Sequence, residues 1–377
     1  MNYKSYVGAP LVGALKRAGL LVIAITFILR VNTLCAEEAV RVGVTYSPQQ
    51  SVYLNQEWKK TYIEILDAGF RVIRLGAYWS EIEAEPGVYD FSELDWQIAE
   101  AAKRNIPILL TVGMKAPRWP EYFIPEWVLK KTDLRFGGDV SEDAYLREKT
   151  LEFLRIAVSR YSSKAIIHWW QVENEPLNRA GPRQWWIKKD FLAEEVKLVK
   201  RLDERNRPIV INAATYPNKT LRFLVNLTSP NHPIPEAIEL CDIFAINVYP
   251  IVGHKFMWMK MRLWTHPPER VEHLSEIVNS ARAQNKDVWV TELQTEPWEP
   301  GELVHMGPEK SITAWPSVFQ SDFEELRSIG IKTILLWGAE YWIYRRDTYD
   351  DKSWWEAGMD IVNGHRGAGP EARGKKM

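Results

Sequence analysis

Residues 166–176, Ile-Ile-His-Trp-Trp-Gln-Val-Glu-Asn-Glu-Pro, contain the pattern that decides the fold of this chain. An apolar run suited to a buried strand ends in acidic and amide side chains, and a proline follows them. Comparable apolar runs recur along the sequence, at 41–46, 71–76, 107–113, 208–213, 241–248, 287–292 and 332–338. Because Val, Ile and Leu are nearly continuous in these runs, we expect strands that are buried on both faces of a parallel sheet.

Amphipathic segments separate the expected strands. They predict helices at 57–68, 93–104, 142–160, 182–204, 268–284 and 315–328, whereas the segment between the fifth and sixth strands is poorly periodic. Gly69 closes the first of these helices, and Ser92 is suited to cap the N-terminus of the second. Strands that alternate with helices in this way predict an α/β fold, a single-domain (β/α)8 TIM barrel. A doubly wound open sheet is the alternative, but no glycine-rich phosphate loop follows any of the strands.

The composition is that of one large globular domain. The chain has 377 residues, of which 46% are hydrophobic and 26% are charged, and its formal net charge is −1. This near-neutral balance gives no reason to expect a polyanionic partner such as nucleic acid. Tryptophan is abundant, with 18 residues. We expect some of these rings in the core and in loop packing, and others along a ligand cleft.

Residues 1–36 have the features of an export signal. Basic residues precede an apolar run at 18–29, which suits a signal peptide and is short for a membrane span. Small Ala36 offers a cleavage point. We therefore expect a cleaved signal peptide and a secreted or periplasmic protein, with an uncleaved membrane anchor as the alternative. The barrel domain should then occupy 37–363, and 364–377 should form a disordered basic tail.

Two glutamates stand where expected strands end. Glu175 follows the fourth strand and Glu292 ends the seventh, and each leads into a loop that contains proline and tryptophan. In a barrel, the C-terminal ends of the strands meet at one face, where active sites are found. Two carboxylates at that face can flank one glycosidic bond, whose cleavage needs a proton donor and a nucleophile or base. We expect Glu175 to be the general acid/base and Glu292 the nucleophile, rather than members of two unrelated structural ion pairs.

Long loops on the same face carry further tryptophans. The segments after the third, sixth, seventh and eighth strands contain Trp119, Trp127, Trp258, Trp264, Trp298 and Trp342. Of these, Trp119 and Trp298 are expected to stack on the faces of bound sugars. The stretch 256–264 is apolar and basic, and we expect it to form a lid over the cleft, with contact to a lipid surface as the alternative.

Three other polar residues are candidates for the site, but we expect none of them to take part directly in catalysis. Glu173 should point the same way as Glu175, one layer deeper in the barrel, if the strand stays extended, and should support the site from there. Glu296 is expected to be a solvated loop charge, and His168 a core residue of its apolar strand. The histidines show no metal-ligand spacing and the chain has only 2 cysteines, so that no metal or cofactor is implied.

The same residues resemble a known group of enzymes. The motif 174–176 (Asn-Glu-Pro), taken with Glu292, resembles the acid/base and nucleophile motifs of the retaining (β/α)8 glycoside hydrolases of clan A. The stretches 73–80 (IRLGAYWS) and 83–91 (EAEPGVYDF) resemble the second-strand region of family 42 β-galactosidases and family 5 cellulase-like enzymes. The segment 116–120 (APRWP), after the third strand, is also similar to the family pattern.

The resemblance implies roles for further residues. Tyr249 would hydrogen-bond the nucleophile, Arg74 would contact it as well, and Trp337 would lie under the sugar at the cleavage site. Asn174 could hydrogen-bond a sugar hydroxyl. The sequence also departs from the pattern, because it has no histidine after the third strand, where many family 5 enzymes have one. The family 42 β-galactosidases in turn have further C-terminal domains. The choice between the two families, and with it the substrate, stays open.

These features predict a retaining β-glycosidase that hydrolyses the O-glycosidic bonds of a β-linked glucan, mannan or galactoside. The same residues would serve a transglycosylase, which passes the glycosyl unit to a sugar instead of water. A non-catalytic carbohydrate-binding barrel would keep the tryptophans without needing both glutamates. A metal-dependent sugar isomerase would need a cluster of Glu, Asp and His ligands, which the sequence lacks. The expected partner is an oligo- or polysaccharide, with no stable membrane partner unless the N-terminal segment stays uncleaved.

Overall fold

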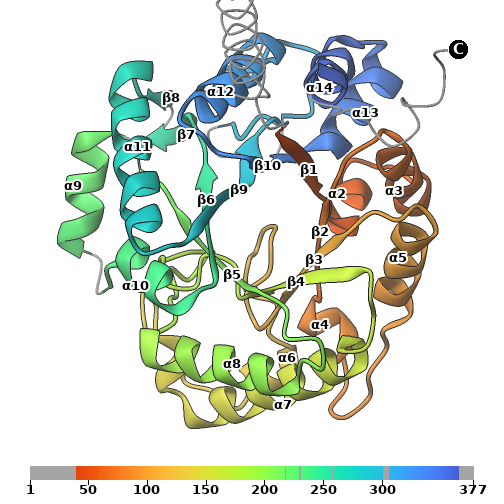
Figure 1. Cartoon of the computed structure of the whole chain (residues 1–377), viewed down its shortest axis with the longest axis vertical. Helices are drawn as coiled ribbons and strands as arrows, with labels where there is room; N and C mark the ends of the chain where they lie inside the picture. The colour runs from red at the N-terminus through yellow and green to blue at the C-terminus, as the bar shows by residue number, and fades with distance from the viewer. Residues whose placement is uncertain (1–39, 217, 229–230, 257–258, 300–304, 365–377) are drawn as a thin grey trace, which may run out of the picture. The chain divides into compact units, whose positions relative to one another are not determined.

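The computed structural model describes residues 40–364, apart from 217, 229–230, 257–258 and 300–304. Within these residues, eight parallel strands form a closed barrel with helices around it (Figure 1). The barrel strands are β1 (Arg41–Thr45), β2 (Ile73–Gly76), β3 (Ile108–Val112), β4 (Ile167–Val172), β5 (Ile209–Ala214), β6 (Ile243–Val248), β9 (Asp287–Gln294) and β10 (Thr333–Trp337).

The barrel is closed by its first and last strands. Around the ring the order is β1-β10-β9-β6-β5-β4-β3-β2, and β1 pairs in parallel with β10 from Arg41 opposite Thr333 to Thr45 opposite Trp337. The predicted TIM barrel is therefore confirmed, and the alternative of a doubly wound open sheet is wrong. All eight barrel strands lie within two residues of the apolar runs that predicted them.

The predicted helices are present, with some boundaries shifted. They are α3 (Trp58–Asp67), α5 (Ser92–Lys103), α7 (Ala144–Tyr161), α8 (Lys189–Leu202), α11 (Pro267–Ala283) and α12 (Pro316–Ser328). The poorly periodic segment between β5 and β6 contains two short helices, α9 (Lys219–Thr228) and α10 (Pro233–Leu240). Ser92 is the first residue of α5 rather than its cap, because Phe91 occupies the cap position and Asp90 accepts the Ser92 N–H at 2.8 Å.

Short elements that the sequence did not predict lie in the loops and after the last strand. They are α2 (Pro48–Tyr53), α4 (Trp79–Ile82), α6 (Glu126–Leu129), η1 (Val140–Glu142), α13 (Ala339–Tyr349) and α14 (Ser353–Gly364). After β6, an antiparallel hairpin of β7 (Ile251–Phe256) and β8 (Met259–Trp264) takes up most of the stretch expected to form a lid. Trp258 lies outside the described residues.

The barrel interior is filled in two layers. Toward the N-terminal ends of the strands lies an apolar layer that includes Trp169, Val210, Ala245 and Trp289. Side chains two residues further along a strand point the same way, and these are Gln171, Asn212, Asn247 and Thr291, which hydrogen-bond one another. The guanidinium of Arg41 lies 5.4 Å and 5.8 Å from the ring centroids of Trp169 and Trp289 and covers the apolar layer from below. The polar layer forms the floor of the barrel mouth.

The ends of the chain fall outside this description. The expected signal peptide, residues 1–36, and residues 365–377 of the expected tail are not among the described residues, whereas Gly364 is the last residue of α14. Of the helices that the structure describes, none is both long and apolar enough to cross a membrane.

Candidate active site

A cavity of about 460 Å³ opens at the C-terminal ends of the barrel strands. Glu175 and Glu292 both line it, although 117 positions separate them in the sequence. The other predicted site residues that line the cavity are Trp119, Asn174, Tyr249, Trp298 and Trp337. Arg74 lies fully buried beneath it. The structure therefore brings the predicted residues together at one place.

A bulge in β9 turns Glu292 toward the cavity. The pairing of β9 with both neighbouring strands loses its register just after Val290. An extra residue in one strand lets two successive side chains face the same side, which regular alternation forbids. Thr291 accordingly donates to Asn247 in the polar layer, with Oγ1 and Oδ1 2.7 Å apart, while Glu292 lines the cavity.

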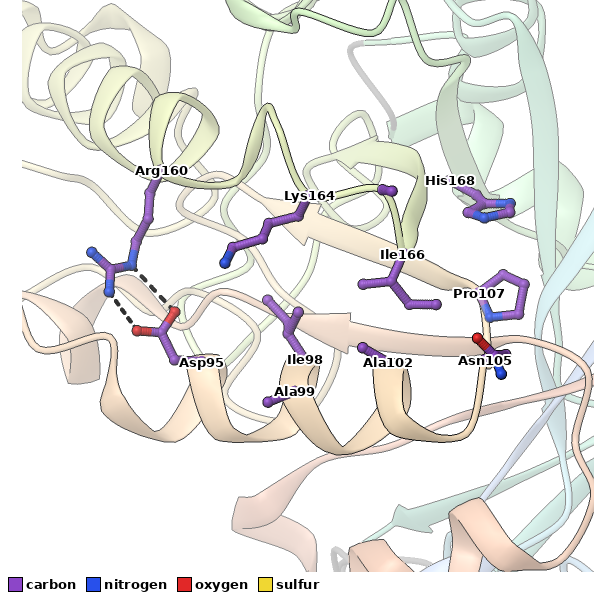
Figure 2. Close-up of a pocket in the computed structure, with 11 residues that line it drawn as sticks. Asp95, Ile98, Ala99, Ala102, Asn105, Pro107, Arg160, Lys164, Ile166 and His168 are labelled. Carbon is purple, nitrogen blue, oxygen red and sulfur yellow. Dashed lines mark hydrogen bonds and ion pairs between the residues drawn. The ribbon is translucent and has the colours of Figure 1, made fainter.

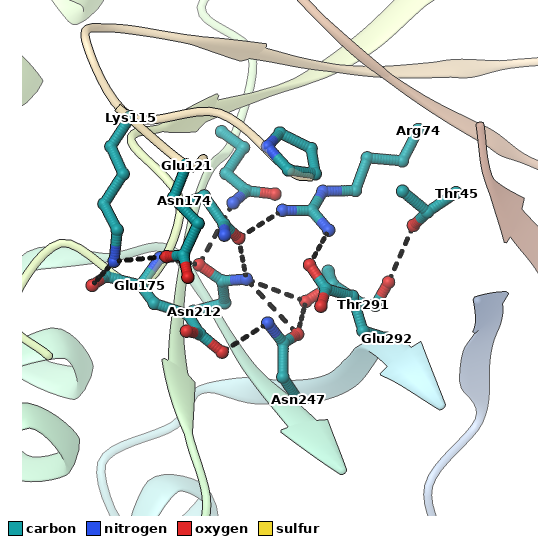
Figure 3. Close-up of polar contacts among 12 residues, drawn as sticks. Thr45, Arg74, Lys115, Glu121, Asn174, Glu175, Asn212, Asn247, Thr291 and Glu292 are labelled. Carbon is teal, nitrogen blue, oxygen red and sulfur yellow. Dashed lines mark hydrogen bonds and ion pairs between the residues drawn. The ribbon is translucent and has the colours of Figure 1, made fainter. Parts of the chain in front are cut away.

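Two donors from other strands hold the carboxylate of Glu292. Arg74, on β2, places its Nη1 2.6 Å from Oε1, and the hydroxyl of Tyr249, just after β6, lies 2.7 Å from Oε2 (Figure 3 shows the Arg74 contact). Both oxygens are thus fixed, and one donor carries a full positive charge. These two hydrogen bonds orient the carboxylate and offset the free-energy cost of burying its negative charge, which suits a nucleophile.

The same arginine also orients Asn174. Its Nη2 donates to the amide oxygen of Asn174 at 2.6 Å, and Asn212 of the polar layer donates to that oxygen at 2.9 Å (Figure 3). Because the oxygen is occupied by two donors, the amide nitrogen is the group left to face the cavity. Asn174 is therefore set to donate a hydrogen bond to a ligand.

Glu175 has different surroundings. The backbone leaves the strand after Val172, and Glu175 has a φ of +46°, held by a hydrogen bond from its N–H to Asn212 Oδ1 at 2.7 Å. Asn247 Nδ2 donates to its carboxylate at 2.7 Å (Figure 3). Burial raises the pKa of Glu175 to about 7, the ammonium of Lys115 opposes this rise, and the negative charge of Glu292 adds to it. Glu175 can thus carry a proton near neutral pH, as an acid catalyst must.

Glu173 supports the site, but not from the position expected. The strand does not stay extended, because Glu173 has a φ of +60°. Its carboxylate is fully buried and accepts the backbone N–H groups of Met114 at 2.8 Å and Lys115 at 2.5 Å. It does not line the cavity, but it fixes the loop after β3 to the turn that carries Glu175. Burial raises the pKa of Glu173 to about 7, and the hydrogen bond with buried Glu195 of α8 lowers it.

The expectation for Glu296 was wrong. Glu296 is buried rather than solvated, lines the cavity, and pairs with Arg118 at 2.5 Å. Gln50 Nε2 donates to its other oxygen at 3.0 Å. No sequence pattern predicts this pairing, because the partners come from the loops after three different strands.

The tryptophans divide between the rim and the interior. Trp119 and Trp298 are 41% and 40% exposed on the cavity rim, as a stacking role requires. Trp337 is buried at the end of β10, and the guanidinium of Arg118 lies 3.9 Å from the centroid of its ring. Trp342 is fully buried and donates to Thr295 O at 2.8 Å, a packing role.

Sequence reasoning missed the residues that hold Glu175 in place. Asn212 and Asn247 belong to the polar layer, and Lys115 donates through Nζ to the carbonyl oxygen of Glu175 at 2.8 Å. Asn212 and Asn247 do carry a signal, because each stands two residues after an apolar side chain of the barrel interior. Lys115 carries none, since its position depends on the path of the loop after β3.

A second hollow, of about 990 Å³, lies at the other end of the strands (Figure 2). It lies beside α5 and the start of β4, and Arg160 pairs there with Asp95 at its edge. His168 lines it and is exposed, so the expectation of a core histidine was wrong. The hollow has no pair of carboxylates facing it. Among the described residues, no group of three or more His, Cys, Asp or Glu side chains is arranged to hold a metal ion.

Known proteins resemble this chain in two ways. A family model described as β-galactosidase matches residues 45–204. A β-galactosidase of Thermus thermophilus is 27% identical over 143 residues, which are 36% of this chain and 22% of that protein. A β-galactosidase of Haloferax lucentense is 25% identical over 142 residues, 36% of this chain and 21% of that protein. The chain therefore spans about a fifth of the length of these curated relatives.

Solved structures share the fold over most of the chain. A β-galactosidase from Rahnella sp. R3 matches with a TM-score of 0.60 at 14% identity, over 86% of this chain and 56% of that one. A family 5, subfamily 18 protein from Streptomyces cattleya, solved with GlcNAc, matches with a TM-score of 0.57 at 13% identity, over 88% and 82%. A β-galactosidase model matches residues 45–204, and solved proteins of families 42 and 5 share the barrel, so the chain is similar to the glycoside hydrolases of clan A.

Proposed function

We propose that this protein is a retaining β-glycosidase that cleaves an O-glycosidic bond by double displacement. The observation that carries the proposal is the difference between two carboxylates in one cavity. Arg74 and Tyr249 both donate hydrogen bonds to the carboxylate of Glu292, whereas burial and the negative charge of Glu292 raise the pKa of Glu175 to about 7. A pair whose environments differ in this way can supply a nucleophile and a proton donor at the same pH.

In the first step, a carboxylate oxygen of Glu292 attacks the anomeric carbon, and the bond from that carbon to the leaving oxygen breaks. Glu175 gives its proton to the leaving oxygen, so that a neutral alcohol departs and a glycosyl ester of Glu292 remains. Asn174 donates its amide N–H to a hydroxyl of the sugar. Arg74 keeps the attacking carboxylate in place while the negative charge of that carboxylate is lost on formation of the ester bond.

In the second step, Glu175 is ionised and takes a proton from water. The water oxygen attacks the anomeric carbon, the ester bond breaks, and the electron pair returns to the carboxylate of Glu292. Two inversions at one carbon retain its configuration. If a sugar hydroxyl takes the place of water, the same residues transfer the glycosyl unit, which is the transglycosylase alternative.

The substrate class proposed is a β-linked galactoside, glucan or mannan. The relatives described as β-galactosidases make an aryl β-galactoside the first substrate to test. The exposed rings of Trp119 and Trp298 on the rim offer stacking surfaces for a sugar that extends out of the cavity.

The test is sugar release from a panel of aryl β-glycosides, β-glucans, mannans and xylans by the wild type and by Glu292→Gln. The variant keeps the shape and the Tyr249 contact but has no carboxylate to attack with, so turnover should fall by at least about 10⁴-fold while the protein stays folded. Glu299→Gln is the matched control, because Glu299 is a buried glutamate of the loop that follows β9 and does not line the cavity. Substantial activity in Glu292→Gln would exclude the assignment. Folded wild type that binds sugars and releases none would instead favour a non-catalytic binding barrel.

We also propose that the protein is exported, on the strength of its first 36 residues alone. N-terminal sequencing of the protein from its native host tests this. A mature chain that begins at Glu37 would support secretion, and an intact N-terminus in the membrane fraction would support the anchored alternative.

A further inference from the structure

A buried polar cluster lies beside the cavity, past Glu292, and the proposed chemistry does not use it. It consists of Gln50, Arg118, Glu296 and Glu340 with the ring of Trp337, and we call it the Arg118 cluster. All of its members except Glu340 line the cavity. Its members come from α2 after β1, from the loops after β3 and β9, and from β10 and α13. Glu175 and the two asparagines that contact it come from the ends of β4, β5 and β6. Because β9 lies between β6 and β10 in the ring, the cluster members from β10, α13 and α2 lie on the other side of Glu292, and Arg118 joins them from the loop after β3.

Arg118 is the centre of the cluster. Its Nη1 donates to Glu296 Oε1 at 2.5 Å, its Nη2 lies 3.9 Å from Glu340 Oε1, and its guanidinium lies over the Trp337 ring. Gln50 donates to the second oxygen of Glu296 at 3.0 Å. All of these polar side chains are at least nine-tenths buried.

Two backbone positions with positive φ angles, Gly338 and Arg118, make room for the cluster. Gly338, directly after Trp337, has a φ of +110°, and a Cβ there would lie 2.4 Å from Cβ of Glu296. A side chain at position 338 would therefore displace Glu296 from the cavity wall. Arg118 itself has a φ of +108°, a conformation that costs a non-glycine residue about 1–3 kcal/mol and is kept where the surroundings impose it.

Several atoms of the cluster lack a hydrogen-bond partner within the described residues. They are Arg118 Nε, Arg118 Nη2 and Glu340 Oε2, all fully buried. Buried polar atoms are nearly always hydrogen-bonded, so unpartnered donors and an acceptor beside a cavity indicate a ligand that supplies both. A hydroxyl group can donate and accept at once. Because two carboxylates surround one guanidinium, the cluster suits neutral hydroxyls and disfavours a negatively charged ligand.

We propose that the Arg118 cluster binds hydroxyls of the sugar at the cleavage site, on the part of the ring remote from the anomeric carbon, and thereby selects the sugar. This inference rests on the proposed glycosidase function. The leaving oxygen must face Glu175, and the anomeric carbon must face Glu292. The rest of the sugar ring then extends away from Glu175, toward β9, β10 and β1, where the Arg118 cluster lies. The favoured substrate is a neutral hexoside with its remote hydroxyls free, and a uronic acid is disfavoured.

The experiment compares kcat/KM for 4-nitrophenyl β-D-galactoside, the corresponding glucoside, their 3-, 4- and 6-deoxy analogues, and the glucuronide. Wild type, Glu296→Gln and Glu299→Gln are assayed side by side, with Gln50→Met as a milder change that removes one donor to Glu296. A hydrogen bond between a hydroxyl and a charged group should make the wild type prefer the parent glycoside over at least one deoxy analogue by about ten- to a hundred-fold. Glu296→Gln should bring that ratio close to one, and Glu299→Gln should leave it unchanged.

Other outcomes overturn the inference. If Glu296→Gln lowers kcat/KM by the same factor for parent and deoxy glycosides, Glu296 holds the loop rather than positioning Arg118 for a hydroxyl. Equal turnover of every analogue by the wild type, or an unchanged preference in both Glu296→Gln and Gln50→Met, would contradict it as well. Ready turnover of the glucuronide would contradict the preference for neutral sugars. If the wild type turns over no glycoside at all, the proposed function itself fails, which is a separate result.

Discussion

Glu175 and Glu292 are chemically identical side chains, and their neighbours alone make them different. Tyr249 and Arg74 come from different strands and each hold one oxygen of Glu292, at 2.7 Å and 2.6 Å. Glu175 receives one amide donor, from Asn247, at 2.7 Å. The division of labour in the proposed reaction therefore depends on residues that do not react.

The hydroxyl of Tyr249 provides a direct test of this dependence. Tyr249→Phe keeps the ring and removes one hydrogen bond to the charged carboxylate, so kcat/KM should fall by about ten- to a hundred-fold in a steady-state assay. Tyr344→Phe is the control, because its hydroxyl donates to Met306 O at 2.8 Å away from the cavity. An unchanged kcat/KM in Tyr249→Phe would mean that the contact is not needed for attack.

The two principal glutamates could be predicted from the sequence, and the Arg118 pairing could not. Glu175 and Glu292 each follow a clear apolar strand, and the barrel topology then brings them together. Glu296 stands in an irregular loop, where burial depends on partners that sequence separation hides. His168 was misjudged for a related reason, because β4 loses its register against β3 between Ile167 and Trp169, and His168 lies exposed beside α5.

At the scale of elements, the loop after β3 is joined tightly to the turn after β4. Gly113 has a φ of +130°, and a Cβ there would lie 2.1 Å from Glu173 Oε1. Gly113→Ala should therefore displace the carboxylate that fixes both loops, and lower the free energy of unfolding by about 2–4 kcal/mol. Gly87→Ala is the matched control, because Gly87 also has a positive φ, +74°, but open space around it.

For Gly87→Ala the expected loss is about 1–2 kcal/mol, from backbone strain alone. Urea denaturation of both variants measures the difference, and kcat should fall only in Gly113→Ala. Equal losses in the two variants would show that the contact with Glu173 contributes nothing.

Strands and long helices of this fold were predictable because each is one continuous pattern of apolar residues. The bulge in β9 was not, since it changes which way Thr291 and Glu292 point without changing their residue types. The start of α8 was placed seven residues too early, because the preceding turn from 182 onward is pinned by a bridge between Asp139 and Trp186 instead of being helical. Contacts of this kind between distant segments do not show in the hydrophobic periodicity of the sequence.

For the whole molecule, several buried carboxyl groups should make the free energy of unfolding fall as pH rises toward 7. Burial raises the pKa of Glu173, Glu175, Asp322 and Glu340 to about 7 in each case. Each binds a proton more tightly folded than unfolded, so its contribution is present below about pH 4 and is lost as pH rises toward 7. Acids with a lowered pKa, such as Asp95, act in the opposite sense only below about pH 4. Burial lowers the pKa of His168 and His273, and these two groups offset part of the effect between about pH 5 and 7.

The protein should therefore melt at a higher temperature at pH 5 than at pH 8, by several degrees. Calorimetry at constant ionic strength measures this. Asp322→Asn should reduce the difference, since an amide at that position cannot ionise. A melting temperature that rises from pH 5 to pH 8 would contradict the expectation.

The seam between β1 and β10 joins the first and the last strand of the barrel. A ribosome must therefore release Thr333–Trp337 before the ring can close, long after both glutamates have been made. Until then β1 and β9 each keep a bare edge of unpaired amide and carbonyl groups, which are templates for pairing with other chains. A protein shortened before β10 would contain both glutamates of the proposed reaction and would still be expected to aggregate rather than to catalyse it. Folding of this chain thus requires that the exposed edges of β1 and β9 do not pair with other chains before β10 has been synthesised.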